Sequence, residues 1–319
     1  MPRCLVIGAG IAGLSAASRL AAAGVEVVVI DKGRAVGGRM ATRRWDGAAF
    51  DHGAQHFSVR TTGFGAEVER WRAAGVAAAW YRGASRTRPE RGVEERHVGI
   101  GGMRRIPEYL AARLEVHTGV TVDAIAVGAA VRVESGGGPA FDGDAAIVTP
   151  PVPQTLALLD GSGVRWGEWR ERLGSVGYRA TLAVLARLHE SPGLTEGHRA
   201  VAGSDVAWIA DNHHKGVSPV PAVTVHSTAE FAALHLEDPP ERWTPPLLEA
   251  ASEVAPLDVA GAIGHRWRYA EPAETFDVGA VRLDGAAPVV LAGEVFAGAK
   301  VEGAFTSGAA AAALVLEGV

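Results

Sequence analysis

Residues 5–20 read LVIGAGIAGLSAASRL, and this stretch decides how the chain begins to fold. An apolar run ends at Gly8, and Gly8, Gly10 and Gly13 form the pattern G-x-G-x-x-G. Buried parallel strands are typically continuous apolar runs. Glycines in this pattern allow a tight turn, close approach of a pyrophosphate, and close packing of helix on strand. The sequence therefore predicts a strand, a phosphate-binding turn and a helix that ends near Gly24.

A second apolar run, Val25 to Ile30, leads to Asp31, which stands 23 residues after Gly8. An acid at this point binds ribose hydroxyls in dinucleotide-binding folds. The order of strand, helix, strand and acid predicts an adenine dinucleotide site. A glycine-rich turn without a ligand is the alternative.

The next stretch favours FAD over a nicotinamide dinucleotide as cofactor. Residues 32–44 read KGRAVGGRMATRR, in which Gly37 and Gly38 precede Arg39. We interpret this as a second phosphate-approach loop, where Arg39 bonds oxygens in a fork. The segment FDHGAQHFSVR follows at residues 50–60; its alternative interpretation is a strand and turn with ordinary core aromatics.

A second glycine-rich region lies near the other end of the chain. Residues 289–292 predict a short strand, Gly293 and Glu294 follow, and residues 301–304 open an alanine-rich helix. A helix N-terminus stabilises negative charge such as that of a reduced flavin. A plain surface helix over residues 304–316 is the alternative. Two such halves predict a chain that leaves its nucleotide-binding domain and returns to it.

The composition describes a large, weakly acidic chain. Its 319 residues are 48% hydrophobic and 21% charged, with a formal net charge of −5. This length supports a large core and, we predict, two domains. The charge gives no support to a nucleic-acid role. Cys4 is the one cysteine of the sequence, and we expect it in the core. A single cysteine excludes a CxxC pair and a cysteine metal cluster, and no other metal site is predicted. We find no export or membrane segment and expect a cytoplasmic protein.

We predict an FAD-binding domain from residues 1–60, 97–150 and 271–319, and a substrate domain from residues 61–96 and 151–270. Within them we expect helices at 64–74 and 243–254, and within 97–114 a turn that leads into an amphipathic helix. We also expect strands at 116–125, 130–134, 140–148, 177–188 and 222–226, and a hairpin turn at 135–139. An arginine-rich loop at 82–96 is expected as a solvated loop or a phosphate-binding lid. Five tryptophans of the second domain form either a wall for a flat substrate ring or core packing: Trp166, Trp169, Trp208, Trp243 and Trp267.

At this point the chain resembles a known family over essentially its whole length. The motifs that carry the likeness are DKGRAVGGRMATRR, FDHGAQHF, GIGGMRRI, AWIADNHHKG, TVHSTAEF, HRWRYAEP and LAGEVF with VEGAFTSG. They are similar to those of the renalases, especially bacterial renalase-like proteins of the amine oxidase superfamily. The resemblance implies an α/β fold in which a Rossmann-type FAD-binding domain joins an α+β substrate domain, as in p-hydroxybenzoate hydroxylase. It also implies an oxidase that converts 1,2- and 1,6-dihydro isomers of NAD(P) to NAD(P)⁺ and passes the electrons to O₂ as hydrogen peroxide.

The resemblance also assigns residues. FAD contacts fall on Gly8, Gly10, Ile11, Ala12, Gly13, Asp31, Lys32, Gly38, Arg39, Met40, Gln55, His56, Phe57, Val122, Gly293, Glu294, Glu302, Gly303 and Ala304. The substrate chamber falls on Asn212, His226, Trp267 and Tyr269. Two histidines in NHHKG, residues 212–216, depart from the small polar residues frequent in such stretches. Because the one cysteine lies far from the C-terminal flavin motif, we expect non-covalent FAD.

No acid–base dyad, metal cluster or nucleophile elbow stands out in the sequence. Hydride transfer from a dihydropyridine needs no general base, so this absence fits the renalase interpretation. Trp267 and Tyr269 are candidates for the ring wall, and Asn212 and His226 for polar contacts, although His226 and Trp267 are equally well core residues. Two other functions remain open: an FAD-dependent amine oxidase or dehydrogenase of a small organic substrate, and a flavin-binding redox sensor without turnover. The sequence leaves the oligomeric state open.

Overall fold

The computed structural model describes residues 1–84 and 92–318, and the chain forms two compact units. Unit 1 comprises Met1–Gly38, Pro107–Gly177 and Pro272–Val319, and unit 2 comprises Arg39–Ile106 and Tyr178–Glu271. Each unit is therefore assembled from segments that are far apart in the sequence.

Unit 1 contains both strands and helices. They are β1 (Arg3–Ile7), α1 (Ile11–Ala22), β2 (Glu26–Asp31), α3 (Arg105–Ala111, which begins in unit 2), β7 (Glu115–Thr118), β8 (Val122–Val127), β9 (Val131–Ser135), β10 (Phe141–Gly143), β11 (Ala145–Val148), α4 (Val152–Leu159), α5 (Trp169–Gly174), β17 (Val281–Leu283), β18 (Val289–Leu291), α8 (Glu294–Ala297) and α9 (Val301–Leu316). Six of the strands form one sheet in the order β17-β18-β11-β1-β2-β7, and β8, β9 and β10 form a second sheet.

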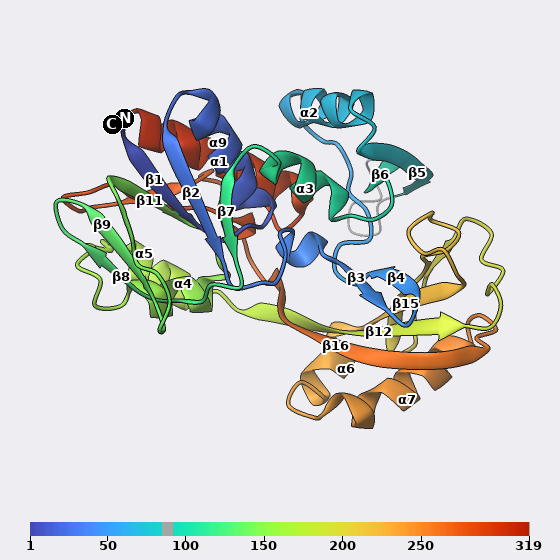
Figure 1. The fold of residues 1–319 in the computed structure, drawn as a ribbon. Helices are drawn as coiled ribbons and strands as arrows, with labels where there is room; N and C mark the ends of the chain where they lie inside the picture. The colour runs from blue at the N-terminus through green and yellow to red at the C-terminus, as the bar shows by residue number, and fades with distance from the viewer. Residues whose placement is uncertain (85–91, 319) are drawn as a thin grey trace. The chain divides into compact units, whose positions relative to one another are not determined.

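The six-stranded sheet is parallel from β18 to β7, and only β17 runs antiparallel to its neighbour. Helices α1 and α9 lie against one face of this sheet (Figure 1). Cys4 and Val6 belong to the core on that face, whereas Leu5 lies against Gly143 of β10. Both faces are thus covered, which explains the continuous apolar run of β1. Cys4 is fully buried, as predicted, and burial raises the pKa of its thiol to about 12.

Unit 2 is built on an antiparallel sheet. Its elements are β3 (Thr42–Trp45), β4 (Ala48–Asp51), α2 (Thr62–Ala73), β5 (Ala77–Ala84), β6 (Val93–Gly99), β12 (Tyr178–Leu188), β13 (His198–Ala200), β14 (Val206–Asp211), β15 (Ala222–Ser227), α6 (Ala229–Leu234), α7 (Pro240–Ser252) and β16 (Val259–Pro272), and a short 3-10 turn spans Gly38–Met40 at its boundary. The sheet order is β13-β14-β15-β12-β16, and the hairpins β3–β4 and β5–β6 are separate. Helices α6 and α7 cover one face, where Trp243 of α7 is fully buried (Figure 1).

The structure confirms most predicted elements and corrects three of them. The helices at 64–74 and 243–254 correspond to α2 and α7, and residues 135–139 link the antiparallel strands β9 and β10. The predicted loop at 82–96 is wrong where the chain is described, because β5 and β6 pair as a hairpin; residues 85–91 lie outside the described residues. The single strand expected at 116–125 is instead β7 and β8, so Val122 begins a strand rather than ending one. The single strand expected at 140–148 is likewise two strands, β10 and β11, which belong to different sheets.

The boundaries of the two units differ from the predicted domain boundaries. Residues 39–60 and 97–106 fall in unit 2, and residues 151–177 fall in unit 1. The physical reason for the first difference is local: β4 packs through Phe50 on Leu185 and Ala222 of the five-stranded sheet.

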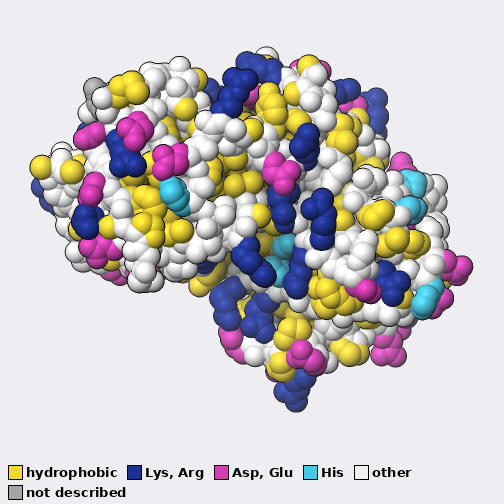
Figure 2. All heavy atoms as spheres, viewed as in Figure 1, with side chains coloured by type: hydrophobic (Ala, Val, Ile, Leu, Met, Phe, Trp, Pro, Cys, Tyr) yellow, Lys and Arg dark blue, Asp and Glu magenta, His cyan; other side chains and the backbone are white. Residues whose placement is uncertain are grey.

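The surface carries both signs of charge. Figure 2 shows lysine and arginine side chains interspersed with aspartate and glutamate on the face that it draws. None of the helices among the described residues is both long and apolar enough to cross a bilayer.

Candidate functional site

The predicted nucleotide residues meet at one edge of the parallel sheet. Because β1, β2, β11 and β18 run in the same direction, their carboxyl ends place Gly8, Asp31, Thr149 and Gly293 at that edge. The Thr149 hydroxyl donates a hydrogen bond of 2.8 Å to the carbonyl of Ile7. The chain order reverses between β1 and β11, and such a switch point is where doubly wound sheets bind ligands.

The glycines of the first motif have separate tasks. Gly8 has a φ of +107°, which favours glycine, and a side chain there would collide with Thr149. A side chain on Gly13 would collide with the carbonyl of Gly8, so Gly13 lets α1 pack closely on the turn. At Gly10, by contrast, an added Cβ would meet no atom within 4 Å, and no side chain caps the start of α1. The uncapped N-terminus and the open space beside Gly10 fit a dinucleotide pyrophosphate.

Asp31 holds the glycine turn in place. Its Oδ2 accepts a hydrogen bond of 2.6 Å from Ala9 N, and its Oδ1 accepts one of 2.6 Å from Gly33 N. The Asp31 carbonyl accepts a bond of 3.0 Å from Val120 N, which brings the start of β8, where Val122 stands, next to this edge. Each carboxylate oxygen keeps a second lone pair for a ribose hydroxyl.

The C-terminal half of the site lies in the same unit. Gly293 N donates a hydrogen bond of 2.9 Å to the Ser307 hydroxyl, and Glu294 and Glu302 are buried. A side chain on Gly303 would collide with the carbonyl of Gly298, so the first turn of α9 lies tightly against the preceding loop. Unit 1 therefore brings together the predicted FAD residues of both chain ends.

Unit 2 contains a buried polar network around Asp51. Asp51 Oδ1 accepts hydrogen bonds from the Thr42 hydroxyl (2.6 Å) and from Met103 N (2.8 Å). Asp51 Oδ2 lies 2.8 Å from the ammonium of Lys215, and both side chains are fully buried. Asp51 thereby ties three separate chain segments together.

Asn212 is part of this network. Its Oδ1 accepts a bond of 3.1 Å from Asp51 N, and its Nδ2 donates one of 2.9 Å to the Thr224 hydroxyl. The side chain is fully buried, so its amide is held by protein groups at both ends.

The carbonyl of His52 gathers two other predicted substrate residues. It lies 3.0 Å from His226 Nε2 and accepts a bond of 2.8 Å from Trp267 Nε1. The imidazole of His52 stacks on the indole of Trp267, with ring centroids 5.0 Å apart at 16°. The imidazole of His265 lies 4.5 Å from both rings, tilted to His52 and edge-on to Trp267. Burial lowers the pKa of His52 to about 3 and those of His226 and His265 to about 4. These imidazoles are therefore neutral near pH 7.

Three further predicted residues of unit 2 have partners of their own. Arg39 Nη1 donates to the Tyr269 carbonyl at 3.3 Å, which links the second glycine loop to β16. Gln55 Nε2 donates to the Asp51 and Gly53 carbonyls at 2.5 and 3.1 Å. Phe57 is buried and packs on Phe64 and Trp71, as the core-aromatic alternative anticipated.

Sequence reasoning missed Lys215 and the rings of Trp80, Tyr81 and His198. Lys215 lies inside the motif AWIADNHHKG, but its partner Asp51 stands 164 positions earlier, and no local pattern pairs the two. Two adjacent aromatics, Trp80 and Tyr81, were a visible signal next to the arginine-rich stretch.

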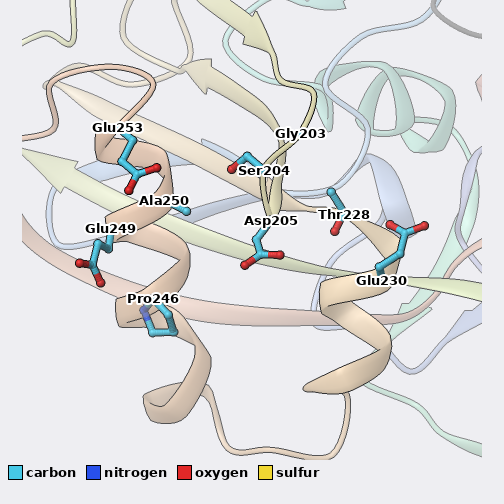
Figure 3. A pocket seen from close by; sticks show the side chains of 9 residues that line it. All are labelled: Gly203, Ser204, Asp205, Thr228, Glu230, Pro246, Glu249, Ala250 and Glu253. Atoms are coloured by element: carbon cyan, nitrogen blue, oxygen red, sulfur yellow. The ribbon is translucent and has the colours of Figure 1, made fainter.

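An open hollow of about 720 Å³ lies elsewhere on unit 2. Figure 3 shows the carboxylates of Asp205, Glu230, Glu249 and Glu253 around it. Its hydroxyls serve local structure: Thr228 caps α6 by accepting from Phe231 N, and Ser204 accepts from Val206 N. This hollow is an acidic surface feature with no sign of a ligand among these contacts.

Comparison with known proteins identifies the family. Residues 81–316 match the family described as flavin containing amine oxidoreductase, and residues 6–69 match an NAD(P)-binding Rossmann-like domain. The chain belongs to the flavin-containing amine oxidoreductases. The family and its Rossmann-like dinucleotide-binding domain identify the cofactor as FAD.

Relatives of this flavin-containing oxidoreductase match over a short stretch. The chain is 52% identical over 48 residues to a 4,4'-diapophytoene desaturase of Staphylococcus haemolyticus, which is 15% of this chain and 10% of that protein. It is 47% identical over 58 residues to a hydroxyneurosporene desaturase of Rubrivivax gelatinosus, or 18% and 11% of the two chains. The chain thus matches about a tenth of the length of these curated relatives.

Solved structures are similar over the whole chain. Putrescine oxidase bound to putrescine superposes with a TM-score of 0.74 at 16% identity, covering 99% of both chains. A putative protoporphyrinogen oxidase from Exiguobacterium sp. 255-15 gives 0.73 at 13% identity, again over 99% of both chains. At these identities the likeness confirms the predicted α/β fold and leaves the substrate open.

Proposed function

We propose that this flavin-containing oxidoreductase oxidises 1,2- or 1,6-dihydro isomers of NAD(P), as the renalase-like motifs imply. In this reaction the dihydropyridine ring loses a hydride and becomes the aromatic nicotinamide of NAD(P)⁺. FAD supplies the hydride acceptor, flavin N5, and O₂ takes up the two electrons with protons to give H₂O₂. The predicted domain roles follow: unit 1 holds most of the FAD contacts and unit 2 the substrate residues.

The observation that carries this proposal is the absence of charged imidazole in the group around the His52 carbonyl. His52, His226 and His265 have pKa values lowered to about 3–4, so near pH 7 they hold no extra proton to donate and accept one poorly. The ammonium of Lys215 is held by Asp51. Such a set of residues suits hydride transfer, in which no proton leaves carbon, better than acid–base chemistry.

Among the proposed substrate residues, Trp267 has the clearest task. Its indole Nε1 is fixed by the His52 carbonyl, so the ring plane is set before any ligand arrives. A fixed aromatic face orients a flat nicotinamide at little entropic cost. His226 helps to hold the same carbonyl, and Tyr269 lies two residues further along β16, with its carbonyl bonded to Arg39.

The test is anaerobic reduction of the yellow FAD-loaded protein. We expect 1,2- or 1,6-dihydro-NAD to bleach the flavin rapidly, ordinary NADH to do so slowly, and amines to leave it oxidised. The rate of reduction should vary little between pH 6 and 9, because no group in the site described above needs to titrate. Admission of air should then restore the flavin spectrum and release one H₂O₂ per substrate.

Two outcomes would contradict the proposal. Bleaching by putrescine or another amine would show that the substrate is an amine and not a dihydro isomer of NAD(P). A bell-shaped pH profile for reduction by a dihydro isomer would show that a general acid or base takes part.

A further inference from the structure

We propose that five aromatic side chains of unit 2, His56, Trp80, Tyr81, His198 and Trp208, form a binding site for a flat heteroaromatic ring of a nucleotide. We call these residues the ring cluster. The inference rests on the proposed function in that the expected substrate carries two such rings, nicotinamide and adenine. It adds a binding site that the predicted chamber residues do not include.

Three rings of the ring cluster form a stack. Tyr81 and His198 lie 3.8 Å apart between ring centroids at an interplanar angle of 30°, and His198 and Trp208 lie 4.8 Å apart at 17°. Trp80 stands nearly perpendicular to Tyr81 and Trp208, at 88° and 78°. His198 thus stacks on both Tyr81 and Trp208, whose own ring centroids lie 6.5 Å apart at 33°. The partly exposed faces of this group suit a further flat ring.

The backbone is adapted to place Trp80 and Tyr81 in one cluster. Consecutive residues of a regular strand point to opposite faces. In the β5–β6 hairpin the register shifts between Ala79 and Tyr81, so Trp80 is the extra residue of a bulge. A bulge redirects side chains, and here both aromatics contact His198 and Trp208.

The second wall comes from the five-stranded sheet. His198 pairs with Ala210 and Ala200 pairs with Trp208 across β13 and β14, so the two rings lie diagonally on one face. Each ring has an alanine as its direct partner, which leaves room for the rings to stack on each other. His56 closes the group, 5.4 Å from Trp208 and 5.6 Å from Tyr81.

The exposure of these rings separates them from core packing. Trp71 and Trp243 fill the core of unit 2 and are fully buried. All five members of the ring cluster are instead only partly buried. Partial exposure leaves the five rings able to contact a ligand, which the fully buried rings of Trp71 and Trp243 cannot do.

Lys215 contacts one member of the ring cluster, Trp80. Its ammonium lies 4.9 Å from the centroid of Trp80 while it is paired with Asp51. This contact ties the ring cluster to the Asp51 network and fixes Trp80. Burial lowers the pKa of His198 and raises that of Tyr81 to about 12, so these two rings are uncharged near pH 7. Such rings select a flat base by stacking rather than an ion.

The test is calorimetric titration of FAD-loaded protein with NAD⁺. Loading with FAD keeps the cofactor's own adenine site occupied. We expect Trp208→Leu and Tyr81→Leu each to raise the Kd for NAD⁺ by roughly tenfold to a hundredfold, the usual cost of losing one stacked base. Trp208→Phe, which keeps a ring, should recover most of the affinity.

The two halves of NAD⁺, AMP and nicotinamide mononucleotide, show which of its rings is bound. If the adenine stacks there, the variants weaken binding of AMP and spare nicotinamide mononucleotide; if the nicotinamide stacks there, the reverse holds. Trp45→Leu is the matched control, because Trp45 is a partly buried tryptophan of the same unit outside the ring cluster, and it should bind NAD⁺ like the unaltered protein. The flavin-to-protein absorbance ratio confirms that each variant is folded and loaded.

The inference is overturned if the unaltered protein binds none of the three ligands, or if Trp208→Leu and Tyr81→Leu bind them unchanged. If Trp208→Leu does not retain FAD, the Kd values of Trp208→Phe and Tyr81→Leu test the inference instead. The titration needs no turnover, so it is independent of the proposed reaction. Binding that depends on the ring cluster without flavin reduction by any dihydro isomer would refute the reaction alone. Reduction with an unchanged KM in the variants would refute the ring cluster alone.

Discussion

Lys215 and Asp51 form an ion pair in which both side chains are fully buried. Removing one charge from such a pair leaves the other uncompensated in a low-dielectric interior, at a cost of about 3–5 kcal/mol. We therefore expect Lys215→Met to lower the urea midpoint of unfolding strongly. The double variant Asp51→Asn with Lys215→Met should regain much of the loss, because an amide still accepts from Thr42 and Met103. Equal midpoints for the single and double variants would contradict this account.

Neutral, buried histidines make the protein sensitive to acid. The pKa of His52 is lowered from 6.5 to about 3 and that of His226 to about 4, whereas the unfolded chain protonates both below pH 6.5. The unfolded state then binds more protons, so stability falls as pH falls from 6.5 towards 4, by up to about 1.4 kcal/mol per pH unit for each histidine.

Urea titrations at pH 7, 5.5 and 4.5 measure this loss. His226→Asn should flatten the pH dependence, even if it is less stable at pH 7. His117→Asn, at a partly exposed histidine, controls for loss of an imidazole. A slope that His226→Asn leaves unchanged would show that other groups cause the acid sensitivity.

At the scale of elements, α1 and α9 pack so closely that only glycine fits at one contact. A side chain on Gly308 of α9 would collide with the backbone of Ala12 in α1. Gly308→Ala should separate the helices and cost about 1–3 kcal/mol. Gly63→Ala in α2, where an added Cβ meets nothing within 4 Å, should be neutral or gain up to about 1 kcal/mol. Thermal unfolding compares the two, and a similar shift in both would mean that the helix contact is unimportant.

The sequence predicted elements best where one local pattern decided them. The strand before Gly8 and the helix after it were predictable because glycines, apolar run and acid lie within 31 residues. The hairpin of β5 and β6 was not, because arginines dominate its sequence and a bulge at Trp80 breaks the alternation of side chains. The Asp51–Lys215 pair and the ring stack bring together residues distant in sequence, which no periodicity reports.

At the scale of the whole molecule, both ends of the chain contribute to unit 1. The sheet places β1 between β2 and β11, and β18 adds beyond β11, while the chain passes through unit 2 twice in between. The return of the chain was predictable from the two glycine-rich ends. The boundary at Gly38 was not, because the segment after it continues the nucleotide motif in sequence but packs through Phe50 on the sheet of unit 2.

Because unit 1 is assembled from three segments, FAD should stabilise the protein as a whole. A ligand that binds only the folded state adds about 2.7 kcal/mol when its concentration is a hundred times the Kd. We expect the unfolding temperature of FAD-depleted protein to rise with the logarithm of added FAD. Asp31→Ala should move this curve to higher FAD concentration, since Asp31 holds both Ala9 N and Gly33 N. Asp160→Ala, which removes an exposed carboxylate of the same unit, should leave the curve in place. Coincident curves for the two variants would mean that Asp31 does not shape the cofactor site.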